Sequence, residues 1–341
     1  MGRIKVFCCA ALAVLLSNSC IDEIQLPIRN ERPKLVVEGL VTDEPGPYRV
    51  RLTYSGEFLS AGQLPPELSV SNAEVFITDD AGSRTRLVSL RRPGFYETND
   101  PSFVGRVGRS YTISVRLPDG RQYVSRPERM LPVPPIDTVY AEFVTINNPG
   151  RSYAYDIFVD TKDAPQTRDY YRWTAFSQHL HRSVGVPCSA SSPPPVPLCF
   201  YLCWYPTFSR NVNIFSDAAV NGQPLRRRFV LRSPVYFMGN HLVEVSQYSM
   251  SREAFQFWRL YGEQAARTGS IFDPLPASIE GNVANADDPD DIALGYFAAS
   301  AVAKRRYVVP GTETFNPRIV HYIDSLRTYP KGNCLFAFPG S

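Results

Sequence analysis

Four aspartates stand close together in the segment NADDPDDIALG, at positions Asp287, Asp288, Asp290 and Asp291. Clustered carboxylates can bind Ca²⁺, because this hard cation prefers oxygen ligands. The spacing differs from the alternating pattern of an EF-hand loop, and Pro289 restricts the backbone. These residues are therefore weak calcium candidates, and the favoured interpretation is an acidic turn between two strands.

Two histidines could also bind a metal. His179 and His181 lie two positions apart, so on a strand they would face the same side. Two imidazoles do not complete a metal site, and no acidic residue lies beside them in the sequence. We therefore expect surface or loop histidines and no metal at this position.

Motifs for catalysis are missing from the sequence. It contains no His-Glu-x-x-His, Gly-x-Ser-x-Gly or GxGxxG motif and no phosphate-binding loop. Carboxylates such as Asp156, Asp160 and Glu244 could serve a hydrolase only if the fold set two of them a few ångströms apart. We therefore expect a protein that is not an enzyme and has no cofactor, with a hydrolase as the less favoured alternative.

The N-terminus has the pattern of a lipoprotein signal. Arg3 and Lys5 precede an apolar run over residues 6–16, which is too short to cross a bilayer as a permanent helix. Small polar residues then lead into Cys20, whose thiol would carry the lipid after cleavage. The sequence predicts a signal peptide over 1–19 and an acidic tether over 20–33, with plain secretion as the alternative.

Four further cysteines remain, at Cys188, Cys199, Cys203 and Cys334. An even number in an exported chain predicts two disulfides, for which three connectivities are possible. Cys188 and Cys199 bracket the proline run SSPPPVP and could close that loop, which would leave Cys203 for Cys334. A zinc site is less favoured, because the tight Cys-x-x-Cys spacing is absent.

Aromatic residues crowd around two of these cysteines in the segment CFYLCWYPTF. If a disulfide holds this segment as an exposed loop, then Tyr201, Trp204 and Tyr205 could contact a partner or a ligand. The favoured alternative is that the rings form a small core packed on the disulfide.

The elements that would position these residues are mainly strands. Thirty prolines, 39 tyrosines and phenylalanines together, and alternating patterns indicate a β-rich protein. In SYTISVRLPDGRQYVSR, Tyr111, Ile113 and Val115 alternate with polar residues before a Pro-Asp-Gly turn, which predicts a hairpin. We expect an immunoglobulin-like β-sandwich over 34–126, followed by a proline-rich linker over 127–135.

A larger β-rich domain is expected over 136–341, with one amphipathic helix near 252–267. Ser251 can cap this helix, and Phe255, Trp258 and Tyr261 recur on one face that can pack on a sheet. The segments SIEGNV and ALGYFAASAVAKRRYVV after it are each expected to form one strand.

The charge balance excludes one class of partner. Without Arg3 and Lys5, 34 basic residues remain against 33 acidic ones, so the mature chain is close to neutral. A general nucleic-acid binder would show a strong basic excess, and we expect no nucleic-acid partner.

The C-terminal region resembles a known family. An aromatic helix is followed by GSIFDP, by GNV with an acidic turn, and by LGYF with a strand of small residues. Together with LVVEGLVT and YRVRL near the N-terminus, this order resembles the Bacteroidota outer-membrane lipoproteins described as domain of unknown function 4249. Members often end in a Cys-rich tail, whereas this sequence reads NCLFAFPGS, which leaves the pairing of Cys334 open.

The resemblance implies a lipid anchor at Cys20 in the cell outer membrane, with Asp22 and Glu23 as an export signal to the outer face. It also implies a TonB-dependent transporter as partner, and it brings no catalytic residues. We therefore expect an accessory binding component of a TonB-dependent nutrient uptake system, with an unidentified ligand. The alternative is a structural or envelope-assembly lipoprotein that binds another surface protein.

Overall fold

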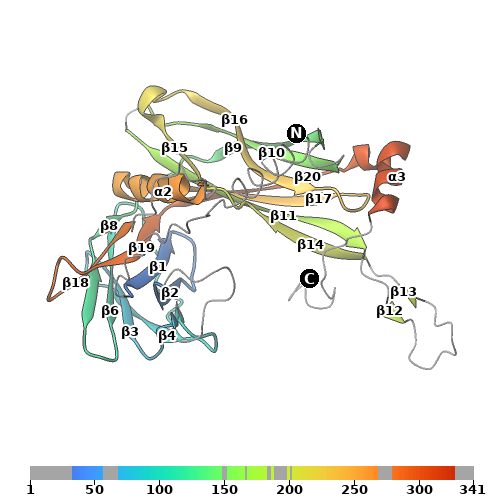
Figure 1. Cartoon of the computed structure of the whole chain (residues 1–341). Helices are drawn as coiled ribbons and strands as arrows, with labels where there is room; N and C mark the ends of the chain where they lie inside the picture. The colour runs from blue at the N-terminus through green and yellow to red at the C-terminus, as the bar shows by residue number, and fades with distance from the viewer. Residues whose placement is uncertain are drawn as a thin grey trace, which may run out of the picture.

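The computed structural model describes residues 33–56, 68–147, 152–165, 167–182, 186–187, 198–199, 202–267 and 279–326 (Figure 1). Strands dominate these residues, so the predicted mainly-β class is confirmed. No helix in the described ranges is long and apolar enough to cross a membrane. Several predicted site residues lie outside the described side chains, namely Cys20, Asp22, Glu23, Cys188, Cys199, Tyr201 and Cys334.

Ten strands form the first unit, which we call the N-terminal barrel. They are β1 (Leu35–Thr42), β2 (Arg49–Tyr54), β3 (Glu74–Asp79), β4 (Arg84–Ser89), β5 (Phe95–Thr98), β6 (Ser110–Arg116), β7 (Gln122–Ser125), β8 (Glu128–Arg129), β18 (Glu280–Asn285) and β19 (Ile292–Ser300). The strands pair in the order β3-β4-β5-β2-β1-β19-β18-β7-β6, and β6 pairs back to β3. This closed ring differs from the two separate sheets of the expected immunoglobulin-like sandwich.

Alternation along the strands fills the barrel. Tyr111, Ile113 and Val115 on β6 are buried in the apolar core, while the residues between them are less buried. The following turn is closed by a hydrogen bond from the Leu117 amide to the Arg121 carbonyl oxygen at 2.9 Å. The predicted hairpin is therefore confirmed as β6 and β7.

The C-terminal half of the chain completes this barrel. Strand β1 pairs in parallel with β19, in a register that places Val37 opposite Gly295. Gly295 has a φ of 79°, and an added Cβ would lie 2.3 Å from the carbonyl oxygen of Val37. Only glycine fits this close approach without displacing the backbone. The orange strands β18 and β19 accordingly lie among the blue and green strands in Figure 1.

Two expectations about this region are wrong. The predicted boundary placed all residues after 136 in the second domain, but β18 and β19 belong to the barrel. The segment over 293–309 was expected to be one strand, but it forms β19 in the barrel and β20 (Val302–Val309) in a different sheet. The buried Ala301 between them is where the chain passes from one unit to the other.

Two facing sheets form the second unit, which we call the C-terminal sandwich. Its elements are β9 (Ile136–Ile146), β10 (Ser152–Lys162), β11 (Tyr170–Arg182), β12 (Val186–Pro187), β13 (Leu198–Cys199), β14 (Leu202–Phe208), β15 (Asn213–Ser216), η2 (Asp217–Ala219), β16 (Pro224–Pro234), β17 (His241–Ser249), β20, η3 (Thr312–Phe315) and α3 (Pro317–Ser325). One sheet has the order β16-β10-β9, and the other has β14-β11-β17-β20 with β15 beside β11. Ile157, Val159, Trp173 and Val245 are buried between them.

The predicted helix is confirmed as α2 (Arg252–Ala265), with Ser251 as its N-cap. The Ser251 hydroxyl oxygen accepts a hydrogen bond from the Ala254 amide at 3.0 Å. Ala254 packs with Met250 and with Tyr296 of β19. The helix therefore lies between the barrel and the sandwich (Figure 1).

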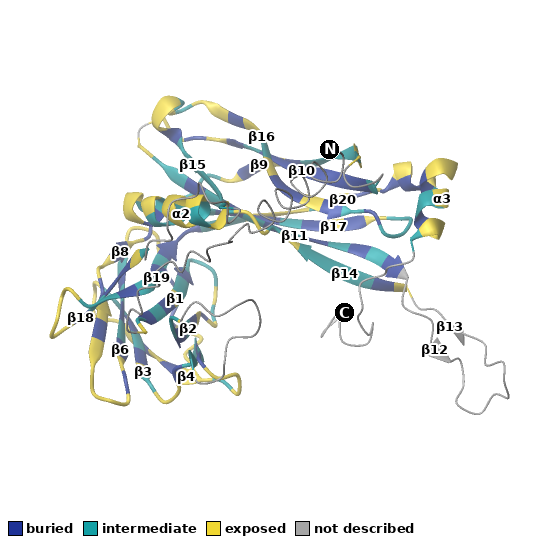
Figure 2. Cartoon of the chain, in the orientation of Figure 1, coloured by how far each residue is buried: buried dark blue, intermediate teal, exposed yellow. Residues whose placement is uncertain are grey.

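The predicted linker over 127–135 is fixed to the sandwich. Gln247 donates to the Pro134 carbonyl oxygen at 2.8 Å, and Ser249 donates to the Leu131 carbonyl oxygen at 2.6 Å. Glu128 and Arg129 within it form the short strand β8. Because β8 pairs with β6 of the barrel, the linker is bonded to both units, and Figure 2 shows buried residues in each of them.

Candidate functional site

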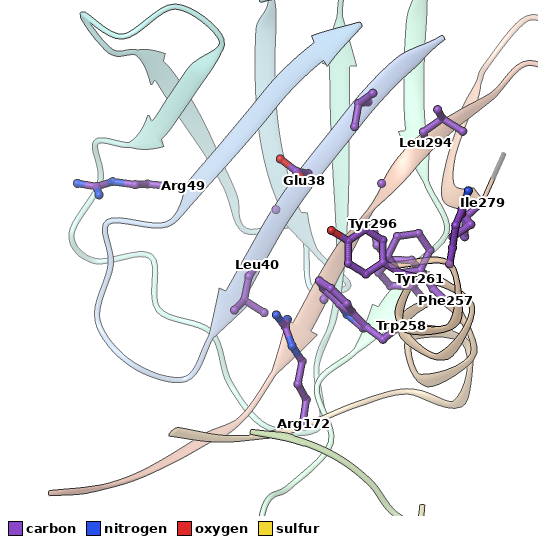
Figure 3. Close-up of a pocket in the computed structure, with 15 residues that line it drawn as sticks. Glu38, Leu40, Arg49, Arg172, Phe257, Trp258, Tyr261, Ile279, Leu294 and Tyr296 are labelled. Atoms are coloured by element: carbon purple, nitrogen blue, oxygen red, sulfur yellow. The ribbon is translucent and has the colours of Figure 1, made fainter. Parts of the chain in front are cut away.

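A cavity of about 640 Å³ lies between the two units (Figure 3). Its walls come from the outward face of β1 and β19, from α2 and from β11. On the barrel side, residues of β1 lie opposite partners on β19, as Val36 does with Leu294 and Leu40 with Ala298. Because β1 is apolar on both faces, its outward face can line a cavity while its inward face fills the barrel.

Aromatic rings of α2 form the opposite wall. The Phe257 ring lies 5.6 Å from the Trp258 ring, which in turn lies 5.5 Å from the Tyr261 ring. Phe257 also lies 5.1 Å from Tyr296 of β19. The three aromatic residues predicted on one helix face do not all line the cavity. Phe255 contacts Tyr170 instead, while Trp258 and Tyr261 line the cavity.

Arg172 of β11 supplies a positive charge to the cavity. Its guanidinium carbon lies 3.7 Å from the centre of the Trp258 ring. The side chain of Arg172 forms no hydrogen bond or ion pair with another residue in the described part of the chain. Burial lowers the pKa of this guanidinium, but an arginine stays charged at neutral pH. Arg172 is therefore a half-buried cation that stacks on an aromatic ring and has no anionic partner among the described residues.

Other charged groups at the rim are already paired. Arg49 forms an ion pair with Glu97 at 3.0 Å, and Arg51 forms one with Glu38 at 3.2 Å. In Figure 3 Arg49 also points away from the aromatic cluster, whereas Arg172 points towards Trp258. Among the described residues, Arg172 is therefore the cation available to a bound anion.

Glu128 fixes two walls of the cavity. Tyr296 donates its hydroxyl proton to Oε1 of Glu128 at 2.5 Å, and Ser251 donates to Oε2 at 2.9 Å. Burial raises the pKa of Glu128, although these hydrogen bonds oppose the shift. One buried carboxyl thus holds both the start of α2 and the Tyr296 ring of β19.

The predicted aromatic contact segment is largely a strand. Trp204 and Tyr205 lie in β14 and are half-buried, and Tyr205 pairs across the sheet with His179. Its ring lies 5.8 Å from that of His179. These two rings therefore do not stand on a free loop, as the partner-contact hypothesis required. Cys203 is disulfide-bonded, and because its partner is outside the described side chains, the connectivity stays a prediction.

The expectation of surface or loop histidines is wrong. His179 is 0% exposed and His181 is 2% exposed, because both continue the inward positions of β11. The His179 ring stacks on that of His241 at 5.3 Å, and His241 Nδ1 lies 2.7 Å from the Ser233 hydroxyl oxygen. Burial lowers the pKa of His179 to about 3 and that of His241 to about 4. Both are therefore neutral at pH 7.

A sequence signal for this burial was present. Positions 171, 173, 175, 177, 179 and 181 share one parity on the strand, and the first three are Tyr, Trp and Ala. An apolar beginning with this period places the histidines on the same inner face. The prediction that the two histidines face one side of a strand is confirmed, but their expected place at the surface disregarded the apolar period that begins at Tyr171.

The acids proposed for a hydrolase are engaged elsewhere. Asp156 accepts two hydrogen bonds from Arg232, at 2.6 and 2.8 Å. Glu244 pairs with Arg306 at 2.6 Å. Asp160 accepts from the Arg227 amide at 2.7 Å. None of the three acids lines the cavity.

The acidic turn does not gather its carboxylates around one point. Asp287, Asp288 and Asp290 are exposed, whereas Asp291 accepts a hydrogen bond from the Tyr123 hydroxyl at 2.6 Å. In the described ranges, the acidic residues that do come together are Asp163, Asp169 and Asp217. The weak calcium hypothesis at the turn is therefore not supported by the geometry.

Comparison with known proteins gives a family but no activity. The solved structure of a two-domain fibronectin type III segment from chicken tenascin is similar over 64% of this chain and 91% of that chain, at 13% identity. Its TM-score of 0.16 is too low to support any argument. A search of curated proteins found no match. A family model described as "Domain of unknown function (DUF4249)" matches residues 21–306. Because this match covers most of its length, the chain belongs to the DUF4249 family.

Proposed function

We propose that this protein is a non-catalytic binding protein, anchored by lipid on Cys20 outside the outer membrane, that holds a small anionic ligand in the cavity between α2 and the barrel. It would act as an accessory component of a TonB-dependent nutrient uptake system. The observation that carries the proposal is the Arg172 guanidinium, which lies beside an aromatic wall and has no anionic partner among the described residues.

The chemistry of the cavity defines a ligand class. A volume of about 640 Å³ falls in the range of small-molecule sites, which often lie between domains. Phe257, Trp258 and Tyr261 offer flat surfaces to a ring or an apolar body. A guanidinium binds carboxylate or phosphate with two parallel hydrogen bonds. The ligand would therefore combine a planar or apolar body with one anionic group.

The sequence supports the anchor, whereas the transporter as partner rests on the family resemblance. The apolar run over 6–16 and the small residues before Cys20 favour lipidation, and Asp22 and Glu23 favour display on the outer face. A tethered protein with a cavity can capture a nutrient and transfer it to a neighbouring transporter. The alternative of an envelope-assembly lipoprotein leaves the Arg172 cation in the cavity without a role, so we favour the nutrient-binding function.

Two dyes of similar shape test the ligand class. The chain from residue 21 onward keeps every described residue and is titrated with 1-anilinonaphthalene-8-sulfonate, which is anionic, and with uncharged N-phenyl-1-naphthylamine. Arg172→Gln should lower the affinity for the anionic dye by about 10-fold or more, because a charge-assisted hydrogen bond is lost. It should leave the affinity for the uncharged dye unchanged. Trp258→Ala should lower the affinity for both dyes.

Arg86→Gln is the matched control, because Arg86 is an exposed barrel arginine outside the cavity. This variant should bind both dyes with the affinity of the wild type. Equal weakening of the two dyes by Arg172→Gln, or no saturable binding of either dye, would reject the cavity as an anion site.

The partner is tested in the native membrane. The full-length lipidated protein is purified from its own outer membrane by an affinity tag, and co-purifying proteins are identified by mass spectrometry. A TonB-dependent transporter in stoichiometric amount supports the accessory role. Recovery of the protein alone would contradict the proposed transporter partner. The dye titrations would still test whether the cavity binds an anion.

A further inference from the structure

Three acidic residues from separate segments meet at one end of the C-terminal sandwich. Asp163 follows β10, Asp169 precedes β11 and Asp217 opens η2. One carboxylate oxygen from each lies within 4.8 Å of the other two. Asp163 and Asp217 are buried, at 2% and 0% exposure. The fold therefore brings three carboxylates into a largely closed space.

Among the described residues, no cationic side chain is paired with this group, because none of their ion pairs includes Asp163, Asp169 or Asp217. Burial and the neighbouring carboxylates raise the pKa values of Asp169 and Asp217. Buried charges are found paired or on metals, since an uncompensated carboxylate is costly to bury. The group therefore requires either protons or a cation.

An orphaned oxygen indicates where a cation would bind. Oδ1 of Asp217 is buried and has no hydrogen-bond partner among the described residues. The other oxygen, Oδ2, accepts from the Asp169 amide at 2.8 Å. Asp163 is oriented in the same way, by the Gly222 amide at 2.8 Å and by the Tyr171 hydroxyl. Outer donors thus hold Asp163 and Asp217, and Oδ1 of Asp217, which no described donor reaches, is left for a ligand.

We propose that Asp163, Asp169 and Asp217 bind a divalent cation and that this ion is Ca²⁺. All three ligands offer oxygen and none offers nitrogen or sulfur, which favours Ca²⁺ over transition metals. Oxygens on opposite sides of a Ca²⁺ ion lie about 4.8 Å apart, twice its usual ligand distance, and the carboxylates fall within that span. Mg²⁺ requires a tighter octahedron and suits this spread less well.

The ion would join three segments of the sandwich. It would tie the end of β10, the start of β11 and the turn η2, which no ion pair between described residues holds together. Strand β11 also carries Arg172 three residues beyond Asp169. The cation site would therefore stiffen the strand that supplies the cavity's charge, although it stands on its own residues.

The test uses the full-length protein in a non-ionic detergent. Its thermal unfolding is followed by circular dichroism in 10 mM CaCl₂ and in EGTA, and CaCl₂ binding is measured by calorimetry. We expect a dissociation constant of about 10⁻⁴ M, as in extracellular calcium modules, and a rise in Tm of about 5 °C or more. MgCl₂ should give a smaller rise.

Asp217→Asn separates a calcium ligand from a residue that is only structural. The variant should lose the calcium response, and in EGTA it should melt at or above the wild-type temperature because one repelling charge has been removed. A purely structural role would lower Tm equally with and without calcium. Asp169→Asn, at a half-buried position, should behave in the same way and replaces Asp217→Asn if that variant does not fold.

Asp287→Asn in the exposed acidic turn is the control and should keep the full calcium response. The proposal is overturned if the wild type shows no calcium-dependent shift, if the aspartate variants of the cluster keep that shift, or if Asp287→Asn alone removes it. The last result would assign the ion to the turn instead.

Discussion

The interiors of the two units differ in what they bury. The barrel core consists of aliphatic and aromatic side chains, among them the fully buried Leu52, Ile77, Ile113 and Phe297. Both units also bury polar side chains, and the barrel buries one carboxyl, that of Glu128 in β8, but the sandwich buries more ionisable groups around its own apolar core. The buried ionisable and polar groups of the sandwich include Asp163, Ser177, His179, His181, Asp217, Ser233, His241 and Gln247.

This difference teaches where solution conditions can act on the molecule. Apolar burial gives a stabilisation that is nearly independent of pH and of ions. Buried titratable groups link folding to proton and cation concentrations. The candidate cavity lies between a unit that should respond weakly to these conditions, through Glu128, and a unit that should respond more strongly.

The largest expected effect tests the apolar side of the comparison. Phe297→Ala removes a fully buried ring from β19, and we expect it to lower the free energy of unfolding by about 3–5 kcal/mol. The loss should be the same at pH 7 and pH 5, as measured by urea unfolding. Phe315→Ala is the control, because Phe315 is 61% exposed and its removal should change stability little. A strong pH dependence of the Phe297 effect would contradict the comparison.

A smaller effect tests the titratable side. Burial lowers the pKa of His179 to about 3, below its unfolded value of about 6.5. The contribution of neutral His179 to the free energy of unfolding is therefore complete above pH 6.5 and is lost as the pH falls from 6.5 towards 3. At pH 5 the loss is about 2 kcal/mol for this histidine.

Replacing His179 measures how much of the pH-dependent change in stability comes from this side chain. Between pH 7 and pH 5, His179→Phe should lose about 2 kcal/mol less stability than the wild type, whatever constant change the substitution brings. Asp169 and Asp217 have raised pKa values and act in the opposite direction, so the difference between the two proteins is the relevant quantity. His321→Gln on the exposed face of α3 should keep the wild-type pH profile. An identical profile for His179→Phe would contradict the prediction.

The bond between linker and sandwich should contribute less again. Gln247 accepts from the Trp173 indole at 2.8 Å and donates to the Pro134 carbonyl oxygen at 2.8 Å. Gln247→Met leaves both partners without this bond, so we expect a loss of about 1–3 kcal/mol in urea unfolding. Gln256→Met on the exposed side of α2 should be nearly neutral. A neutral Gln247→Met would show that the buried polar groups of the sandwich are replaceable.

The smallest effect is expected at the surface of the barrel. Arg49 and Glu97 form an exposed ion pair at 3.0 Å. A double-mutant cycle with Arg49→Gln and Glu97→Gln should give a coupling of less than about 1 kcal/mol, and salt should reduce it. A coupling above about 2 kcal/mol would mean that electrostatics also stabilise the barrel.

Local patterns were sufficient for much of the fold. The alternation of Tyr111, Ile113 and Val115 predicted a hairpin, and Ser251 before an aromatic period predicted α2. Both patterns arise from contacts between residues near in sequence. The parallel pairing of β1 with β19 is a contact between the two ends of the chain, and no local pattern encodes it.

The candidate sites were harder to predict for the same reason. The cavity joins residues of β1, β11, α2 and β19, and the carboxylate group joins positions 163, 169 and 217. Dense acidic segments such as 287–291 attract attention in a sequence, but here three of the four carboxylates are exposed and the fourth, Asp291, bonds to Tyr123. A useful signal was available in LVVEGLVT, whose apolar residues occupy both faces of the strand and indicate that both are covered.

The parallel pairing of β1 with β19 also sets an order in time. Strand β1 begins at residue 35 and β19 at residue 292, so at roughly 5–20 residues per second a ribosome needs on the order of tens of seconds to make the chain between them. During that interval the apolar edge of β1 has no partner and must be protected from aggregation. A premature stop anywhere before residue 292 would therefore destroy the N-terminal barrel as well as the part that it removes.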